Sequence, residues 1–349
     1  MYRDFKYLLA YTLPLSAFMG FYLGGVWSFG CTYVAFVVLP ILELLLPSST
    51  ENVAEHEESD RSSLRFFDYL LYFNLPLLYF GVGMFIYQVA YGQPSTFEYT
   101  GYIFNLGTLI GTIGINVGHE LGHRYNLPEK LIAQGLLLPG LYQHFQIEHN
   151  HGHHKHVATP ADPASARSGE SLYQFWFRSV TGQWRNAWRI QAKQMRAKGQ
   201  SPWSWRNLMA RFQLMNILYI GTAWYFFGST VGLGLLAAGV AGFLLLETVN
   251  YIEHYGLSRK KLPSGRYEPV SPVHSWNSNH EMGRIFLYEL TRHSDHHFKA
   301  TRKYQILRSH DVSPTLPTGY PGCMLMALVP PVWFAVVDRQ IAKEVQLVN

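Results

Sequence analysis

Three short stretches of the sequence are rich in histidine at spacings that suit metal binding. His119 and His123 are four residues apart, and further histidines lie in His149-Asn-His-Gly-His-His154 and His293-Ser-Asp-His-His297. His254 stands alone between the last two stretches. Residues four apart lie on one face of an α-helix, so their imidazoles can converge on one ion. We expect His149 and His153 to share such a face, with His154 beside them. The chemistry predicted is that of a metal centre.

The number of these histidines indicates two ions. A catalytic zinc takes about three protein ligands and a structural zinc takes four, so nine imidazoles exceed the needs of one ion. Imidazole binds zinc, copper, iron and nickel, so the ligand type leaves the metal open. The two cysteines, Cys31 and Cys323, form no Cys-x-x-Cys motif, which excludes a thiolate zinc finger and a built-in rubredoxin. The candidate metal ligands, which are also the candidate catalytic residues, are His119, His123, His149, His153, His154, His254, His293, His296 and His297.

Polar residues beside these histidines are candidates for orienting them from outside the ligand set. A carboxylate can accept the far N–H of a ligand imidazole, although each one taken singly is equally able to form a structural salt bridge. We expect His310, in contrast, to face solvent. The candidate orienting residues are Glu120, Glu148, Asp162, Glu253, His274 and Asp295.

Long uncharged blocks place much of the chain in a membrane. Only 15% of the residues are charged, while 48% are hydrophobic, against a usual charged fraction of about 25%. About 20 apolar residues are needed to cross roughly 30 Å of hydrocarbon. The fold class predicted is an all-α integral membrane protein, a bundle of six transmembrane helices with a helical cap that holds a di-metal site. The expected spans are about residues 7–28, 30–47, 68–91, 99–118, 208–227 and 231–252.

Three short turns separate paired spans and fix the topology. We expect the turns at Ser28-Phe29-Gly30, at residues 92–95 and at residues 227–230. The loops around these turns hold none of the 28 Lys and Arg residues. The positive-inside rule therefore places both termini in the cytoplasm, together with the cap at residues 119–207 and 253–349. The whole chain, residues 1–349, is expected to form one domain, and no cleavable signal peptide is evident.

Aromatic and basic residues alternate between Leu172 and Met209. Such a pattern can stack on nucleic acid, but beside a membrane it is more typical of an interfacial helix. The formal net charge of +5 does not favour nucleic acid either. We expect a membrane partner and no nucleic-acid partner.

Longer stretches around the histidines identify a family. Their order resembles the histidine-box di-iron family of fatty-acid desaturases, sterol hydroxylases and alkane hydroxylases, and within it the bacterial membrane alkane 1-monooxygenases. Arg124, Thr291 and Val273 depart from that family's pattern, and none of them is a presumed ligand. The stretches that carry the resemblance are residues 118–124, 148–167, 250–257, 274–280 and 292–297 followed by Tyr304-Gln305.

The resemblance implies a di-iron centre with the nine histidines as ligands and dioxygen as cosubstrate. It implies hydroxylation of n-alkanes to 1-alkanols at the terminal carbon, in the bacterial inner membrane. Electrons would come from reduced rubredoxin and its reductase. The rubredoxin is either a separate protein or a domain removed from a longer chain. An apolar channel would admit the alkane from the lipid, and its deep end is expected at Thr112, Ile115 and Asn116, where ordinary helix packing is the alternative.

Three other functions remain in view. A desaturase with the same histidine boxes would form an alkene in place of an alcohol. A metal transporter or sensor would need polar or charged residues at mid-span, and the uncharged blocks do not provide charged ones. A zinc peptidase based on His119-Glu-Leu-Gly-His123 would leave seven histidines unexplained.

Overall fold

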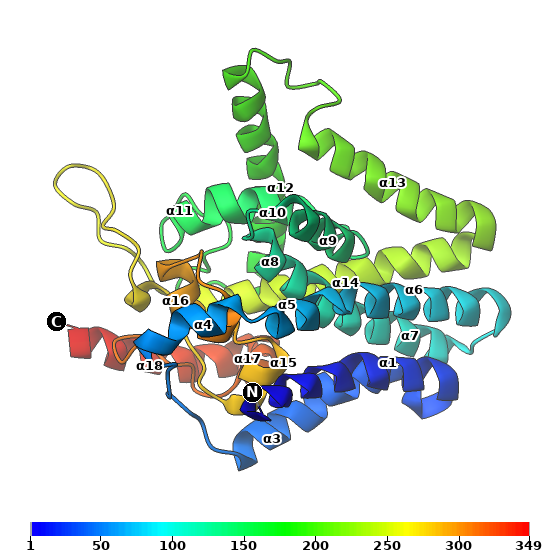
Figure 1. The fold of residues 1–349 in the computed structure, drawn as a ribbon, viewed down its shortest axis with the longest axis horizontal. Helices are drawn as coiled ribbons and strands as arrows, with labels where there is room; N and C mark the ends of the chain where they lie inside the picture. Colours follow the sequence, from blue (N-terminus) through cyan, green and yellow to red (C-terminus); the bar gives the residue numbers. More distant parts are fainter. Residues whose placement is uncertain (1, 349) are drawn as a thin grey trace. The chain divides into compact units, whose positions relative to one another are not determined.

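The computed structural model describes residues 2–348 and consists of helices and loops (Figure 1). Within these residues no β-strand occurs, only isolated bridges such as the one between Lys261 and Tyr267. The all-α fold class is therefore confirmed. Residues 1 and 349, the two ends assigned to the cytoplasm by the topology prediction, lie outside the described residues.

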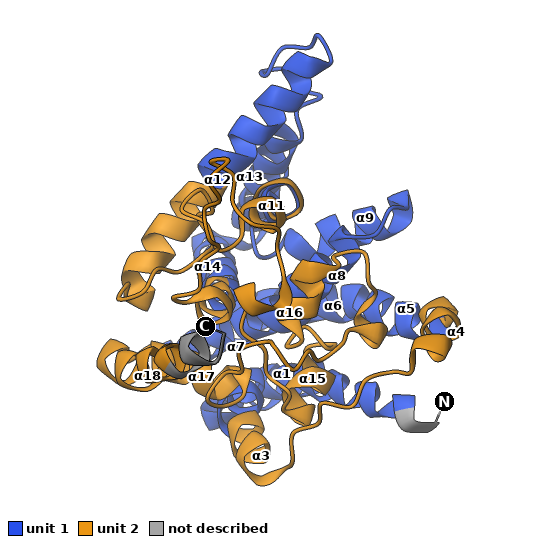
Figure 2. Cartoon of the chain, turned by 90° about the vertical axis from the view of Figure 1, so that its left-hand side faces the viewer, with its two compact units in different colours: residues 1–37, 65–148, 184–246 blue, residues 38–64, 149–183, 247–349 orange. Residues whose placement is uncertain are grey.

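The chain divides into two compact units, drawn in blue and orange in Figure 2. Unit 1 comprises Met1–Val37, Arg65–Glu148 and Trp184–Leu246, and unit 2 comprises Val38–Leu64, His149–Gln183 and Glu247–Asn349. Each unit is therefore assembled from three separate stretches of chain.

The helices of unit 1 are mostly long and apolar. They are the 3-10 helices η1 (Tyr2–Tyr11) and η2 (Gly25–Phe29), the π-helix η5 (Ile110–Ile115), and α1 (Thr12–Leu23), α2 (Gly30–Tyr33), α5 (Arg65–Tyr72), α6 (Asn74–Tyr91), α7 (Thr96–Leu109), α8 (Asn116–Gly122), α9 (Leu127–Leu137), α10 (Phe145–Glu148) and α13 (Leu208–Phe227).

The helices of unit 2 are mostly short, and three helices belong partly to each unit. Unit 2 holds α3 (Leu39–Leu45), η4 (Glu55–Glu57), α4 (Glu58–Ser63), the π-helix η6 (His149–His153), α11 (His154–His156), η7 (Pro272–His274), α15 (Glu281–Phe286), α16 (His293–Phe298), η8 (Tyr304–Ile306), α17 (Tyr320–Ala327) and α18 (Pro330–Val348). Three helices have residues in both unit 1 and unit 2: η3 (Val34–Val38), α12 (Leu172–Ala197) and α14 (Ser229–His254).

The first apolar block breaks earlier than the sequence predicts. The break lies at Gly24 and Gly25, which have φ values of 61° and 52°, and not at Ser28-Phe29-Gly30. Only glycine adopts positive φ without a steric penalty, so these two residues reverse the chain after α1. Gly30 has a helical φ of −46°, and it therefore begins α2 where the prediction expected a turn.

The other two predicted turns are confirmed. Residues 92–95 separate α6 from α7, and α7 begins with a capping box in which Ser95 and Glu98 bond each other's main-chain N–H groups. Gly228, with φ of 91°, separates α13 from α14.

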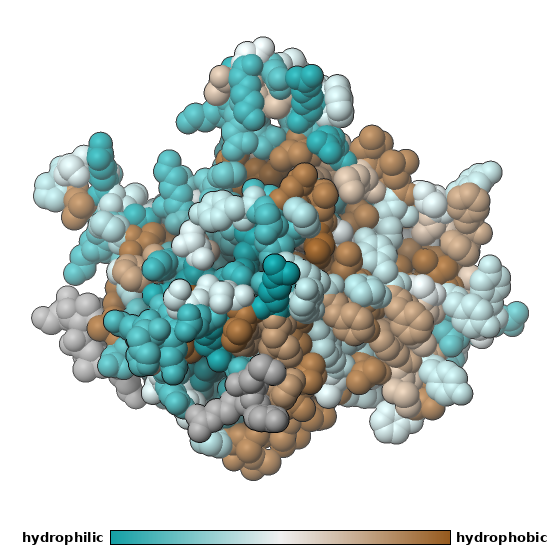
Figure 3. Space-filling view, in the orientation of Figure 1, coloured by the Kyte–Doolittle hydropathy of each residue, from teal (hydrophilic) through white to brown (hydrophobic). Residues whose placement is uncertain are grey.

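Three helical segments of the described chain are long and apolar enough to cross a membrane: Gly25–Leu45, Arg65–Tyr91 and Ser229–His254. They overlap the predicted spans at 30–47, 68–91 and 231–252. The other predicted spans, at 7–28, 99–118 and 208–227, are also largely helical, but their crossing of a membrane stays a prediction. Figure 3 shows hydrophobic side chains gathered at the surface over α3, where Ile41, Leu44 and Leu45 are exposed. An apolar exterior of this kind is expected of lipid-facing helices.

Glycine and asparagine let the N-terminal helices of unit 1 approach closely. A side chain on Gly30 would place its Cβ 2.2 Å from the carbonyl oxygen of Ser16, so α1 and α2 pack backbone against backbone. The buried Asn105 of α7 accepts a hydrogen bond from the Cys31 N–H and donates one to the Ala17 carbonyl. Small residues and interhelical hydrogen bonds are what hold helices together in lipid.

Large aromatic side chains pack around the C-terminal end of α14 in the core of unit 2. Tyr251 lies 5.3 Å from Tyr255 and 5.3 Å from Trp333 between ring centroids. The indole N–H of the buried Trp276 donates to the carbonyl of Tyr255. These contacts fix the end of α14, and His254 lies within the fixed segment.

Because α1 and α2 touch at Gly30, we expect Gly30→Ala to lower the stability of the protein. Overpacking of this kind costs about 1–3 kcal/mol, and thermal unfolding of the detergent-solubilised protein measures it. Gly83→Ala is the matched control, since a Cβ on Gly83 of α6 meets no atom within 4 Å and alanine favours the helix. Equal transition temperatures for the two variants would contradict the close packing.

Candidate metal centre

Four buried histidines of unit 2 point their ring nitrogens toward a common centre. They are His153 of η6, His254 at the end of α14, and His293 and His297 of α16, and we refer to them as the four-histidine group. The Nε2 atoms of His153 and His297 are 3.2 Å apart, and those of His293 and His297 are 2.9 Å apart. The Nε2 atoms of His254 and His293 are separated by 3.2 Å. One ion at this centre would have four imidazole donors.

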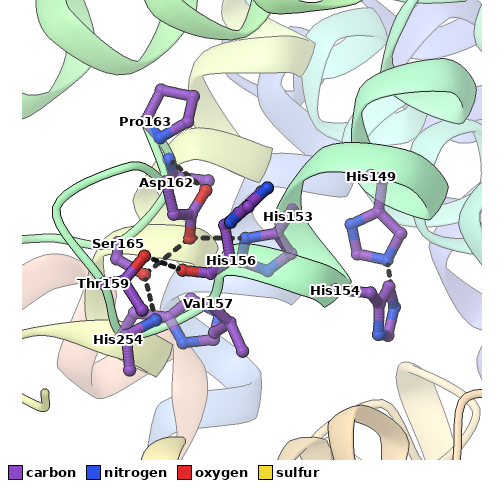
Figure 4. A network of polar contacts seen from close by, with 12 residues as sticks. His149, His153, His154, His156, Val157, Thr159, Asp162, Pro163, Ser165 and His254 are labelled. Carbon is purple, nitrogen blue, oxygen red and sulfur yellow. Dashed lines mark hydrogen bonds and ion pairs between the residues drawn. The ribbon is translucent and has the colours of Figure 1, made fainter. Parts of the chain in front are cut away.

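Three further histidines of unit 2 form a second set, the three-histidine group: His149, His154 and His296. Their candidate ligand nitrogens lie within 4.8 Å of one another. The Nε2 atoms of His149 and His154 are 2.9 Å apart, as the dashed line in Figure 4 marks. The rings of His154 and His296 have centroids 4.9 Å apart.

The remaining two candidate ligands form a pair in unit 1. His119 belongs to α8 and His123 is its C-cap residue. Their Nε2 atoms are 3.2 Å apart, as the spacing of four residues predicts for one helix face.

A π-helix changes how the second histidine cluster is divided. The sequence predicts that His149 and His153 share a face, but the structure pairs His149 with His154 and turns His153 toward the four-histidine group. The physical reason is the wider turn of η6 (His149–His153), in which residues five apart come into line where an α-helix aligns residues four apart. The single stretch thereby supplies both groups.

Burial favours the neutral form of two histidines of α16, His296 and His297. Desolvation holds the pKa of His296 and of His297 well below the usual value, and repulsion from neighbouring imidazoles acts in the same direction. A neutral imidazole is the form that binds a metal, because the ligand nitrogen must carry no proton. The donor set therefore fits a metal ion that prefers nitrogen ligands.

Asp162 fixes the orientation of His153. Its Oδ2 lies 2.8 Å from His153 Nδ1 and also accepts a hydrogen bond from the Ser165 hydroxyl (Figure 4). Although burial by itself raises the pKa of this carboxyl, the contacts with His153 and Ser165 hold its pKa below the usual value. A charged carboxylate on Nδ1 leaves Nε2 of His153 available to an ion.

The hydrogen bonds of the Asp295 carboxylate go to residues after α16 and not to the candidate ligand nitrogens on α16. Both oxygens of this completely buried carboxylate accept a hydrogen bond from Arg302 Nη1 at 2.8 Å. The carboxylate also accepts hydrogen bonds from the Arg308 main-chain N–H and from His310 Nε2. It therefore anchors α16 to the following loop. The expectation that His310 faces solvent is met only in part, because 25% of its side chain is exposed while its ring bonds this carboxylate.

Two other carboxylates predicted to orient ligands have partners outside the histidines. Glu120 accepts a hydrogen bond from Arg124 at 2.8 Å, and Glu148 accepts one from Asn186 at 2.8 Å. Both contacts lie within unit 1.

His274 acts near the four-histidine group through its main chain. Its ring bonds Glu268 and Ser271, whereas its backbone bonds the side chain of His254. The hydroxyl of the next residue, Ser275, lies 3.5 Å from His254 Nδ1. His274, which the sequence predicts to orient a ligand, therefore lies beside His254 and bonds it through its main chain and not through its ring.

Glu253 contacts the opposite ring nitrogen of its histidine partner, His293, from the one predicted. Its Oε2 is 3.1 Å from Nε2 of His293, the atom that faces the other imidazoles, and not from the far nitrogen. Its Oε1 accepts a hydrogen bond from the buried Tyr320 hydroxyl at 2.8 Å. Sequence reasoning missed Tyr320, which stands at the edge of an apolar stretch without a motif.

The three residues expected to line a channel lie in or directly after η5. Thr112 donates its hydroxyl to the Thr108 carbonyl at 2.8 Å. Ile115 is fully buried and its side chain lies against Gly140, and Asn116 is buried at the start of α8. Helix packing accounts for the contacts of Thr112 and Ile115, so their role toward a substrate stays a proposal.

Comparisons with known proteins give a consistent result. The sequence model of the fatty acid desaturase family matches residues 99–325. Alkane 1-monooxygenase 2 of Pseudomonas aeruginosa is 38% identical over 98% of this chain and 93% of its own length. Alkane 1-monooxygenase of Pseudomonas putida is 36% identical over 97% of this chain and 85% of its own length. The xylene/toluene monooxygenase hydroxylase component of Pseudomonas putida is 29% identical over 96% of this chain.

Because Asp162 holds His153, we expect Asp162→Asn to weaken the binding of one ion. Loss of such a partner typically costs about 10–100-fold in metal affinity, which dialysis against a competing chelator followed by metal analysis measures. Asp311→Asn, at an exposed position, is the control and should retain the wild-type affinity. An unchanged metal content in Asp162→Asn would show that this hydrogen bond does not support a ligand.

Proposed function

Because this chain belongs to the alkane 1-monooxygenase family of membrane oxidoreductases, we propose that it hydroxylates n-alkanes to 1-alkanols at the terminal carbon. Dioxygen is the cosubstrate and reduced rubredoxin the electron donor in this proposal. The observation that carries it is the set of closely spaced, mostly buried imidazoles, together with a full-length likeness to curated alkane 1-monooxygenases.

The proposed cofactor is a pair of iron ions. The four-histidine group supplies the donors for one ion. We assign the second ion to the three-histidine group, and His119 and His123 remain candidate ligands, as the nine-histidine set of the family implies. Imidazole donors alone do not select iron, so the family likeness supports the choice of metal. When bound, iron would supply the activation of dioxygen and the hydroxylation of a C–H bond.

The protein's own residues orient the ligand side chains and bury them away from solvent. Asp162 holds His153 in one tautomer, and the Asp295 network holds α16, which carries three candidate ligands. All four members of the four-histidine group are almost completely buried. A site without water strengthens electrostatic interactions and protects reactive species from side reactions.

Substrate binding would rest on apolar burial. An alkane has no polar handle, so each methylene contributes roughly 0.8 kcal/mol when it leaves water. We propose that Thr112, Ile115 and Asn116 line the deep end of the binding channel. Terminal selectivity then depends on the shape of this channel, because the only distinctive feature of the substrate is its end.

Location and electron supply complete the proposal. We place the enzyme in the bacterial inner membrane, in contact with lipid, with both termini and the metal centre on the cytoplasmic side. The three apolar helical segments support a membrane location. The basic residues of α12, among them Arg189, Lys193 and Arg196, support electrostatic steering of an acidic carrier such as rubredoxin, which its reductase would keep reduced.

We expect purified, iron-loaded protein to convert medium-chain n-alkanes to 1-alkanols when it receives reduced rubredoxin and dioxygen. Gas chromatography with mass spectrometry identifies the product, and labelled dioxygen traces its oxygen atom. His293→Ala should abolish the product because it removes a donor from the four-histidine group. An alkene product would point to a desaturase, and no product despite full iron occupancy would refute the proposal.

A further inference from the structure

The connection between α12 and α13 in unit 1 presents two tryptophans to the outside of the molecule. Residues 196–206 form this connection, and we refer to them as the hairpin tip. Trp203 is 86% exposed and Trp205 is 75% exposed. Apolar groups gathered in one exposed place mark an interaction surface. The tip is therefore a candidate for contact with a partner.

Hydrogen bonds hold the tip in a defined shape. The side-chain amide of Asn207 donates to the Pro202 carbonyl at 2.6 Å, and its oxygen accepts from the Met209 N–H at 2.8 Å. The Leu208 N–H donates to Oε1 of Gln191 at 3.2 Å, which ties the start of α13 to α12. The exposure of the two indoles is thus a property of a folded loop.

The same part of unit 1 carries only positive charge. No Asp or Glu occurs between Glu170 and Glu247. Figure 3 shows hydrophilic side chains gathered at the end of the hairpin. A partner with negative charge and an apolar part would complement this surface. The exposed cations between residues 184 and 211 are Arg185, Arg189, Lys193, Arg196, Lys198, Arg206 and Arg211.

The helix that follows the tip exposes apolar side chains. α13 begins at Leu208, and its residues Leu214, Ile217 and Leu218 are all more than half exposed. At a rise of 1.5 Å per residue, Leu214 lies only about 9 Å along the helix from Leu208. Such a face suits lipid hydrocarbon, in agreement with the predicted span at 208–227. The tip would then lie at the level of the lipid headgroups.

We propose that the hairpin tip binds anionic phospholipid headgroups. Trp203 and Trp205 insert at the headgroup level, and Arg196, Lys198 and Arg206 pair with lipid phosphates. Clusters of Lys and Arg directly beside a transmembrane helix attract anionic lipids. This inference rests on the membrane location proposed above and adds a contact that selects among lipids by their charge.

The tryptophans favour lipid over an acidic protein as the occupant of the tip. An indole combines a large apolar ring with a single N–H donor, which suits the boundary between hydrocarbon and water. An acidic protein would complement the cations, but it does not account for two indoles next to a lipid-facing helix. Steering of a soluble carrier by the charge of α12 acts over a distance and needs no contact with the tip.

Fluorescence quenching by brominated lipid tests this contact without an activity assay. The whole protein is incorporated into nanodiscs that contain equal amounts of phosphatidylglycerol and phosphatidylcholine. Bromine is placed on the acyl chains of one lipid or of the other, so the two samples differ only in which headgroup carries the quencher. Subtracting the signal of a Trp203→Phe/Trp205→Phe variant isolates these two among the nine tryptophans of the chain.

We expect stronger quenching of the tip when phosphatidylglycerol carries the bromine, and a smaller difference at high salt, because ions screen the attraction. A variant with Arg196→Gln, Lys198→Gln and Arg206→Gln should lose the difference, since each charge contributes about a fivefold preference for anionic lipid. If this variant is recovered unfolded, Lys198→Gln replaces it and should lose about fivefold of the preference.

The matched control removes three cations from another exposed loop. Lys260, Lys261 and Arg266 are exposed and have no tryptophan beside them. Their replacement by Gln should leave the quenching of the tip unchanged. The charge-conserving variant with Arg196→Lys and Arg206→Lys should also match the wild type.

Several results would overturn the proposal. Equal quenching by the two brominated lipids in the wild type would show that the tip does not select anionic lipid. A control variant that loses the difference as fully as the tip variant would show that only net charge matters. Loss of quenching on addition of an acidic rubredoxin would assign the tip to a protein carrier. Failure of the wild type to enter nanodiscs would refute the membrane location itself, whereas absence of alkanol formation leaves the quenching result unaffected.

Discussion

The structure depends on imidazoles packed closely in a buried site. Their ring nitrogens approach within 2.9–3.2 Å in the four-histidine group, a distance at which protonated rings would repel strongly. Burial lowers the pKa of His297 in this group, and that of His296 in the three-histidine group, and so favours their neutral form. A metal ion at this centre would be bound through the lone pairs of the imidazole nitrogens, and its binding free energy would become part of the folding free energy. The cluster is thus best understood as a site shaped for ions.

The surrounding elements serve that geometry. The wide turn of η6 divides one short stretch between two groups, with His153 in one and His149 and His154 in the other. In α16 the ordinary helical spacing brings His293 and His297 to the same group and turns His296 to the other. Asp162 and Asp295 act in different ways, since the first holds a ligand ring directly and the second holds the helix that carries ligands.

Residue spacing and composition predict the features of this fold that follow from regular helices. The prediction is wrong where the backbone departs from a regular α-helix. The histidine clusters, the all-α class and the turns at residues 92–95 and Gly228 follow from residue types alone. The break at Gly24 has no distinct signal in the sequence, because the block also contains Gly20, Gly25 and Gly30, and only the φ angles of the folded chain distinguish them. The pairing of His149 with His154 and the position of Glu253 depend on a π-helix and on tertiary packing, for which no local pattern exists.

Metal analysis of the detergent-purified protein tests the central claim most directly, when iron and zinc per chain are compared between the wild type and His297→Ala. We expect about two irons in the wild type and about one in the variant, because His297 belongs to only one of the two groups. Zinc alone in the wild type, with iron unable to replace it, would contradict an oxidative di-iron centre. Equal iron contents in the two proteins would contradict the assignment of His297 as a ligand.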